Sequence, residues 1–240
     1  MKVCKSFRFF RSASEKALYV SIMESLESAD FTVATWQCAP LLAAYLSVNA
    51  EVVSGRTILE LGAGTGLPSI AAAKLGAGQI FASERADEQD MLDLLAKNIK
   101  LNRVEENCRV LPLSWSQYDA VLSSLPRVDI VLGADIFYFD GDYPSLFRLF
   151  RSVFLSNPGA VCVIAYQQRN ARLSLWPWLQ RHRLQAELIP LVTFLHPAHA
   201  EGCCSCSCTV SADGETHDEE TIRELPSFSD LLLVKITCAF

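Results

Sequence analysis

The sequence predicts an α/β fold in which helices cover both faces of a mostly parallel sheet. From residue 57 onward, short apolar segments alternate with longer segments of helical periodicity. The apolar segments are hydrophobic almost throughout, as expected for parallel strands that are buried on both faces. The chain has 240 residues, a length that fits one α/β domain. We therefore expect a single domain over residues 1–240.

The expected elements follow one another regularly along the chain. An N-terminal extension, residues 1–50, is expected to hold a strand in the first dozen residues, a strand over 17–24 and a helix over 35–46. This helix would start at a Thr cap and tolerate Pro40 near its first turn. Strands are expected over residues 57–61, 79–83, 108–113, 129–134, 160–166, 184–194 and 230–239. Helices are expected over residues 67–75, 87–101, 143–154 and 174–183.

Residues 196–227 differ from the rest of the chain because they are rich in cysteine and then acidic. They have no apolar period, so we expect a flexible insertion. Its cysteines invite a zinc or copper hypothesis, with His196, His199 or His217 as further ligands. Structural zinc sites favour paired C-x-x-C spacing. The crowded spacing therefore favours a variable thiol-rich loop that binds no metal. The cysteines in question are Cys203, Cys204, Cys206 and Cys208.

The composition narrows the class of protein. A net charge of -6 argues against non-specific binding to nucleic acid, which needs an excess of Lys and Arg. No apolar run is long enough to span a membrane. The nine cysteines are an odd number, and several lie in apolar segments, which indicates a reducing compartment. We expect a monomeric protein of the cytoplasm, the nucleus or both, with no membrane partner.

The most informative motif runs from residue 57 to residue 68, Thr-Ile-Leu-Glu-Leu-Gly-Ala-Gly-Thr-Gly-Leu-Pro. An expected strand enters a loop with Gly62, Gly64 and Gly66, and the loop opens a helix. Dinucleotide sites use G-x-G-x-x-G spacing to bind pyrophosphate, which Glu60 would repel here. A carboxylate at this place suits a ligand with a cationic amino-acid end, such as S-adenosylmethionine. The alternative is a glycine turn that binds no ligand.

Further candidate residues lie where the expected strands end. Glu84 is expected to accept hydrogen bonds from ribose hydroxyls, although a solvated loop glutamate is the alternative. Trp115 either walls an adenine pocket or belongs to the core. Asp135 and Tyr138 follow the fourth strand of the sheet, at the edge where ligands bind in open α/β sheets, and are the catalytic candidates. A helix-capping role is the alternative for Asp135.

With these residues, the chain resembles the seven-β-strand methyltransferases and, among them, the lysine methyltransferases called methyltransferase family 16. The resemblance runs nearly end to end. Three segments are most similar to a member associated with histone arginine methylation. They are Trp36-Gln-Cys-Ala-Pro-Leu-Leu-Ala-Ala-Tyr-Leu, Leu113-Ser-Trp115 and Tyr166-Gln-Gln-Arg-Asn-Ala-Arg.

This resemblance implies a Rossmann-like, seven-stranded, mostly parallel sheet in the order 3-2-1-4-5-7-6. It implies that S-adenosylmethionine lies across the carboxyl ends of the first strands, where Trp36 and Gln37 help to close its pocket and Asp135 borders it. Asp135 and Tyr138 match the D-x-x-Y signature of the lysine-modifying members. The chain departs from better-known arginine methyltransferases, because no pair of glutamates lies near Asp135.

The expected function is methylation of a side-chain nitrogen in a protein: arginine, with histones as a candidate substrate, or lysine. We expect Asp135 to accept a hydrogen bond from that nitrogen, Tyr138 to shape its approach and Tyr166 to line the channel. The alternatives are methylation of a small molecule or an RNA, and a non-catalytic module that binds S-adenosylmethionine and protein partners.

Overall fold

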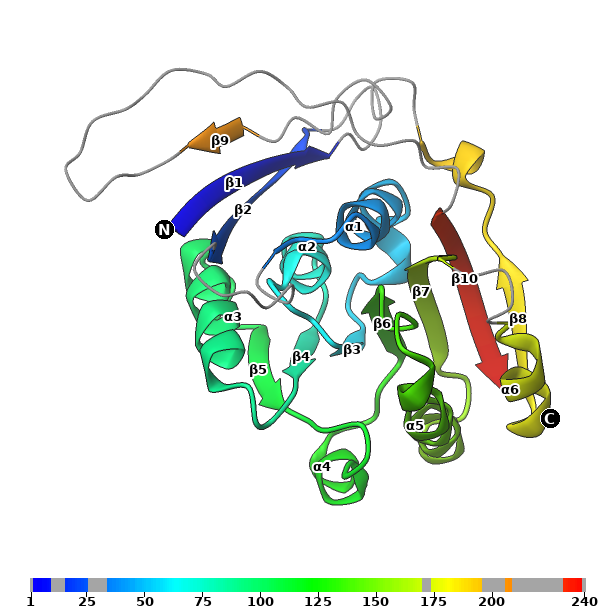
Figure 1. The fold of residues 1–240 in the computed structure, drawn as a ribbon. Coiled ribbons are helices and arrows are strands. Elements are labelled where there is room, and N and C mark those ends of the chain that lie inside the picture. Colours follow the sequence, from blue (N-terminus) through cyan, green and yellow to red (C-terminus); the bar gives the residue numbers. More distant parts are fainter. Residues whose placement is uncertain are drawn as a thin grey trace.

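A seven-stranded sheet forms the centre of the protein (Figure 1). The computed structural model describes residues 2–9, 16–25, 34–169, 174–195, 206–208 and 231–238. The strand order is β5-β4-β3-β6-β7-β10-β8. These strands are β3 (Thr57–Leu61), β4 (Gln79–Glu84), β5 (Cys108–Pro112), β6 (Ile130–Ala134), β7 (Val161–Gln167), β8 (Leu184–Leu188) and β10 (Leu231–Cys238).

The direction of the strands agrees with the expected fold class. Strands β3 to β7 pair in parallel, whereas β10 is antiparallel to both β7 and β8. Numbered along the chain from β3, the sheet reads 3-2-1-4-5-7-6. The mostly parallel α/β class is therefore confirmed.

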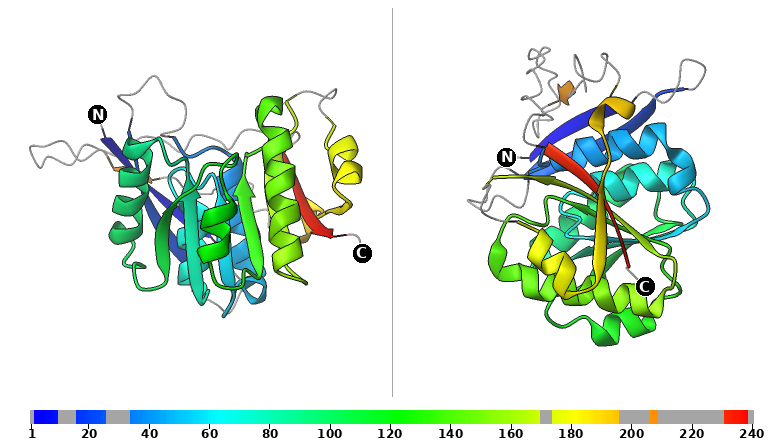
Figure 2. Two further views of the ribbon diagram at one scale, coloured as in Figure 1. Left: turned by 90° about the horizontal axis from the view of Figure 1, so that it is seen from below. Right: turned by 90° about the vertical axis from the view of Figure 1, so that its right-hand side faces the viewer.

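Helices cover both faces of this sheet (Figures 1 and 2). One face carries α1 (Cys38–Val48), α2 (Leu67–Lys74) and α3 (Gln89–Leu101). The other carries α4 (Asp119–Ser124), α5 (Tyr143–Ser156) and α6 (Trp176–Arg181). Three short 3-10 helices lie in connections: η2 (Ala50–Val52), η3 (Asp140–Asp142) and η4 (Leu191–Thr193). Each face has its own apolar core, because the parallel strands contribute buried side chains in both directions.

A second, three-stranded sheet covers α1 to α3 from outside. It consists of β1 (Lys2–Phe9), β2 (Leu18–Ser25) and β9 (Cys206–Cys208) in the order β2-β1-β9. Two α3 amides attach it: Asn98 accepts a hydrogen bond from the Met23 N–H at 2.7 Å, and Asn102 accepts one from the Ser21 N–H at 3.0 Å. The sequence indicated the two N-terminal strands but not their separate sheet.

The cysteine-rich insertion contributes to this sheet, because β9 pairs antiparallel with β1. The sequence did not indicate this short strand within the insertion. Its other residues lie outside the described part of the chain, and these include Cys203, Cys204, His196, His199 and His217.

The structure corrects two expected elements and adds a third. The first helix begins at Cys38, and Thr35 does not cap it, because the Thr35 N–H donates to Glu24 and its hydroxyl meets that of Thr65. The strand expected over 184–194 ends at residue 188, before Pro190, which has no N–H to donate to a sheet. Helix α4 was not expected, since its six residues are too few for an apolar period.

Helix α5 anchors the second core. It has 14 residues, and Phe147 and Phe150 on its inner side are fully buried. Phe147 stacks against Phe137 with ring centroids 5.8 Å apart.

In the described part of the chain, no helix is long and apolar enough to cross a membrane.

We expect Phe147→Ala to lower the free energy of unfolding by about 3–5 kcal/mol, because it leaves a cavity in a packed core. Leu155→Ala on the same helix is the matched control, since Leu155 is 63% exposed, and should change stability by less than about 0.5 kcal/mol. Urea unfolding followed by circular dichroism measures both. Equal effects of the two substitutions would contradict this packing.

Candidate cofactor and substrate site

A cavity of about 660 Å³ opens where β3, β4 and β6 end, and most of the site residues expected from the sequence line it. Its volume lies within the range of about 300–1,000 Å³ that is usual for small-molecule sites. The expected residues on its wall are Trp36, Gly62, Gly64, Glu84, Trp115, Asp135 and Tyr138. Because neighbouring parallel strands end at the same edge, residues from separate parts of the sequence meet there.

The glycine loop between β3 and α2 forms the floor of the cavity. Gly62 has φ +60°, and an added Cβ would lie 3.2 Å from both Trp115 Cζ2 and Ile136 Cγ2. A side chain there would be strained and crowded. Gly66 is different, because it is not on the cavity wall and an added Cβ would lie 2.5 Å from Leu95 Cδ1. Gly66 therefore allows α2 to pack against α3 instead of facing the ligand.

Glu60 does not face the cavity, which corrects the expectation that its carboxylate meets the cationic end of the cofactor. The side chain is fully buried and accepts hydrogen bonds from the backbone N–H and hydroxyl of Ser69 in the first turn of α2. Burial raises the pKa of Glu60 to about 8. Glu60 therefore holds the start of α2 behind the loop, mostly in its neutral form at neutral pH.

Glu84 lies at the end of β4 and on the cavity wall, as the sequence predicts. Its carboxylate accepts hydrogen bonds from the Gly64 N–H at 2.8 Å and the Arg85 N–H at 2.9 Å. Burial raises the pKa of Glu84 above its ordinary value. The carboxylate thus fixes the glycine loop. It lies at the strand end where acidic groups of nucleotide-binding folds accept hydrogen bonds from ribose hydroxyls.

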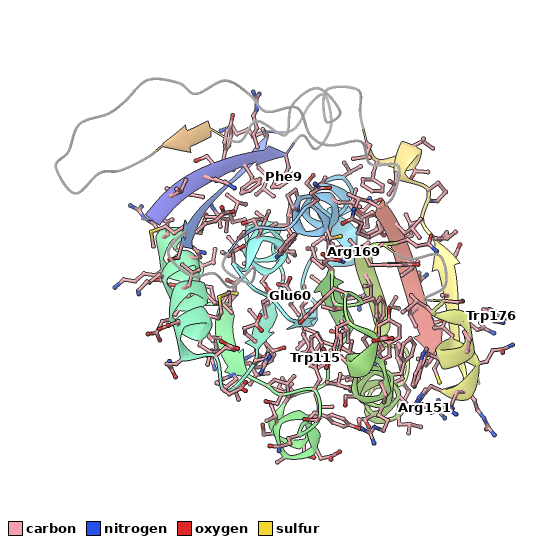
Figure 3. All side chains as sticks on the ribbon, viewed as in Figure 1. Phe9, Glu60, Trp115, Arg151, Arg169 and Trp176 are labelled. Carbon is pink, nitrogen blue, oxygen red and sulfur yellow. The ribbon has the colours of Figure 1, made fainter. Side chains whose placement is uncertain are left out.

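Two tryptophans border the cavity from different sides of the fold. Trp115 follows β5, is half-buried and packs over Gly62. Trp36 precedes α1 and is 42% exposed. Figure 3 shows Glu60, Trp115 and Arg169 over the middle of the sheet and Trp176 at its outer edge. An indole beside a glycine loop provides a flat apolar wall of the kind on which an adenine stacks.

Asp135 follows β6 and is held in an unusual backbone conformation. Its φ is +61°, its N–H donates to the Ala165 carbonyl at 2.7 Å, and only 8% of the side chain is exposed. Residues other than glycine rarely adopt a left-handed φ, and such strain is often found at functional sites. Tyr138, in contrast, is 55% exposed at the cavity wall.

The Asp135 carboxylate already has a partner that the sequence interpretation missed. Arg169 donates from Nη1 to Oδ1 at 2.8 Å and from Nη2 to Oδ2, and its side chain also lines the cavity. A signal was present, because Arg169 follows the strand that was expected to lie beside the Asp135 strand. The end of one strand and the end of its neighbour meet at one edge.

Two other expected residues lie away from the cavity wall. Gln37 is exposed at the N-terminus of α1. Tyr166 packs edge-on against Phe137 with ring centroids 5.6 Å apart. The structure therefore does not support Tyr166 as a channel residue.

The charge of the cavity suits a cationic ligand. Its wall holds five carboxylates and two guanidiniums: Glu84, Asp87, Glu88, Asp135 and Asp142, with Arg85 and Arg169. S-adenosylmethionine has a sulfonium and an ammonium, a ribose that needs acceptors and an adenine that needs an apolar wall. The residues present fit this group. Fold and site together define a Rossmann-like methyltransferase.

Comparison with known proteins identifies the family. The sequence profile of the lysine methyltransferase family matches residues 14–176, and the chain belongs to that family. The histone-arginine methyltransferase METTL23 of Xenopus laevis is 32% identical over 75% of this chain and 76% of its own length. The protein-lysine N-methyltransferase EFM3 of Chaetomium thermophilum is 32% identical over 63% of this chain and 48% of its own.

A solved structure agrees with the fold. The ribosomal protein L11 methylase of Lactobacillus delbrueckii has a TM-score of 0.53 at 16% identity, over 86% of this chain and 81% of its own. The chain is therefore an S-adenosylmethionine-dependent protein methyltransferase that acts on a side-chain nitrogen.

We expect Glu60→Gln to change how stability depends on pH. Because the pKa of Glu60 in the folded protein is about 8, against an ordinary 4.5, its contribution to stability is full below about pH 4.5 and lost as pH rises through about 8. Glutamine does not titrate. The variant should therefore gain stability relative to the wild type as pH rises over this range.

Urea unfolding at several pH values between these limits measures the difference. Glu106→Gln, at an exposed glutamate, is the control and should follow the wild type. A constant difference between Glu60→Gln and the wild type would show that burial does not keep the Glu60 carboxyl neutral.

Proposed function

We propose that this protein transfers methyl groups from S-adenosylmethionine to arginine in a basic protein segment, such as a histone tail. One observation carries the proposal: Asp135 lies on the wall of the same cavity as the glycine loop and Glu84. The name of the Xenopus relative supports arginine in histones as the acceptor. Lysine is the second candidate, supported by the family description and the Chaetomium relative.

In this proposal, different residues of the cavity bind different parts of the cofactor. Gly62 and Gly64 would let the backbone approach the amino-acid end. Glu84 would accept hydrogen bonds from the ribose hydroxyls, and Trp115 would form an apolar wall against the adenine. Trp36 helps to close the pocket. The bound cofactor supplies an electrophilic methyl group on its sulfonium. The protein then has to hold a nitrogen in line with that methyl group and exclude water, without forming a covalent intermediate.

The acceptor nitrogen would be oriented by Asp135. Its carboxylate accepts a hydrogen bond from the nitrogen, and the exposed ring of Tyr138 shapes the approach. An arginine stays protonated at neutral pH and needs a carboxylate to orient it and localise its charge. The acidic rim, with Asp87 and Asp142, attracts a basic segment.

We expect Asp135→Asn to lower the rate of transfer by about 100-fold or more, because the nitrogen loses the acceptor that orients it. Binding of S-adenosylmethionine should change by less than about threefold, since neither glycine-loop nor Glu84 contacts are altered. Asp140→Asn is the matched control, because Asp140 is an exposed carboxylate outside the cavity wall. Calorimetry measures cofactor binding, and radiolabelled methyl transfer measures activity.

The same transfer assay identifies the acceptor when histones and whole-cell protein are the substrates and mass spectrometry locates the methyl group. Methylated arginine is the expected result. Methylated lysine would favour the second candidate. Transfer only to RNA or small molecules, or cofactor binding without any transfer, would contradict the proposed function.

A further inference from the structure

The ion pair between Arg169 and Asp135 lies on the wall of the cavity and not on the open surface of the protein. Both side chains line the cavity. Asp135 follows β6 and Arg169 follows the neighbouring strand β7, and the two residues are 34 positions apart in the sequence. The Asp135 side chain is 8% exposed and that of Arg169 is 37% exposed. By comparison, Arg85 and Asp87 form a pair with side chains that are 56% and 66% exposed.

We propose that Arg169 is a positioning residue for methyl transfer: its guanidinium fixes the plane of the Asp135 carboxylate, so that Asp135 presents a defined acceptor site to the incoming nitrogen. The inference rests on the proposed function, because it concerns how the same site orients its acceptor.

The geometry of the pair supports this role. Arg169 supplies two charge-assisted hydrogen bonds in the planar fork that matches a carboxylate. Because the fork engages both carboxylate oxygens, it fixes the plane of the Asp135 carboxylate at the cavity wall.

The fork also limits the acceptor sites that remain on Asp135. An ionised carboxylate has about four lone-pair sites, and Arg169 uses two of them, one on each oxygen. About two remain, on different oxygens and on the sides away from the fork. The acceptor side chain therefore meets Asp135 through a single hydrogen bond and not through a second fork.

The backbone also holds Asp135 where it can form the fork with Arg169. The left-handed φ of Asp135 is kept by the hydrogen bond from its N–H to Ala165 on β7. Arg169 follows the same strand by two residues. Strand β7 therefore fixes both the Asp135 backbone and the start of the segment that carries its cation.

The test compares Arg169→Gln, Arg169→Lys and the wild type by kcat, KM and calorimetric binding of S-adenosylmethionine, with the acceptor that the wild type methylates. Arg169→Gln should lower kcat by about 10- to 100-fold, while KM and cofactor binding change little. Arg169→Lys keeps the charge without the fork, so it should restore part of the lost kcat. Arg127→Gln, at an exposed arginine remote from the cavity, should match the wild type.

Each other outcome overturns part of the account. A lower KM with an unchanged or higher kcat in Arg169→Gln would mean that Arg169 competes with the acceptor for Asp135. Weaker binding of S-adenosylmethionine together with the lower kcat would mean a purely structural role. If circular dichroism shows that Arg169→Gln does not fold, a wild-type kcat in Arg169→Lys would exclude the fork. Absence of transfer by the wild type would contradict the proposed function itself.

Discussion

Parallel pairing of β3 with β4 on one side and with β6 on the other is the constraint on which the site depends. It brings the ends of three strands to one edge of the sheet and places a different functional group at each end. The glycine loop follows β3, Glu84 ends β4 and Asp135 follows β6. The Glu84 carboxylate then joins two of these ends, because it accepts the Gly64 N–H. Cofactor and acceptor therefore share one cavity as a consequence of the topology.

The carboxyl groups of this region differ in role because their surroundings differ. Glu60 has no cation beside it and is fully buried, so its pKa rises to about 8. It stabilises the start of α2 by accepting a hydrogen bond from the Ser69 N–H. Asp135 is almost as buried but has the Arg169 fork. Burial is therefore similar at the two carboxyl groups, and the donors that reach each of them decide its role. Ser69 holds Glu60 behind the glycine loop, and Arg169 holds Asp135 at the cavity wall.

The sequence was sufficient for the fold class and for several key residues of the cavity wall, for a physical reason. Apolar parallel strands and a glycine loop are local patterns, and residues directly after such strands must lie at the ligand-binding edge. Glu84, Trp115, Asp135 and Tyr138 were found in this way, and Trp36 came from the family resemblance.

What the sequence did not predict depended on contacts between distant segments. The direction of the Glu60 side chain was misjudged, because a strand residue can point into either face and Ser69 determines which partner it meets. The pairing of β9 with β1 spans about two hundred residues and has no local signal. The strand before Arg169 was expected beside the Asp135 strand, but the fork between the two side chains depends on their directions, which no local pattern gives. Helix α4 was too short to be recognised.

A crystal structure of the protein with S-adenosylhomocysteine would test the central claim most directly, namely that one cavity holds the cofactor beside Asp135. The account predicts ribose hydroxyls on the Glu84 carboxylate, the adenine against Trp115 and the sulfur within the cavity that Asp135 borders, with Arg169 still paired to Asp135. A nucleoside bound away from Glu84 and Trp115, or an Asp135 turned away from the sulfur, would contradict it.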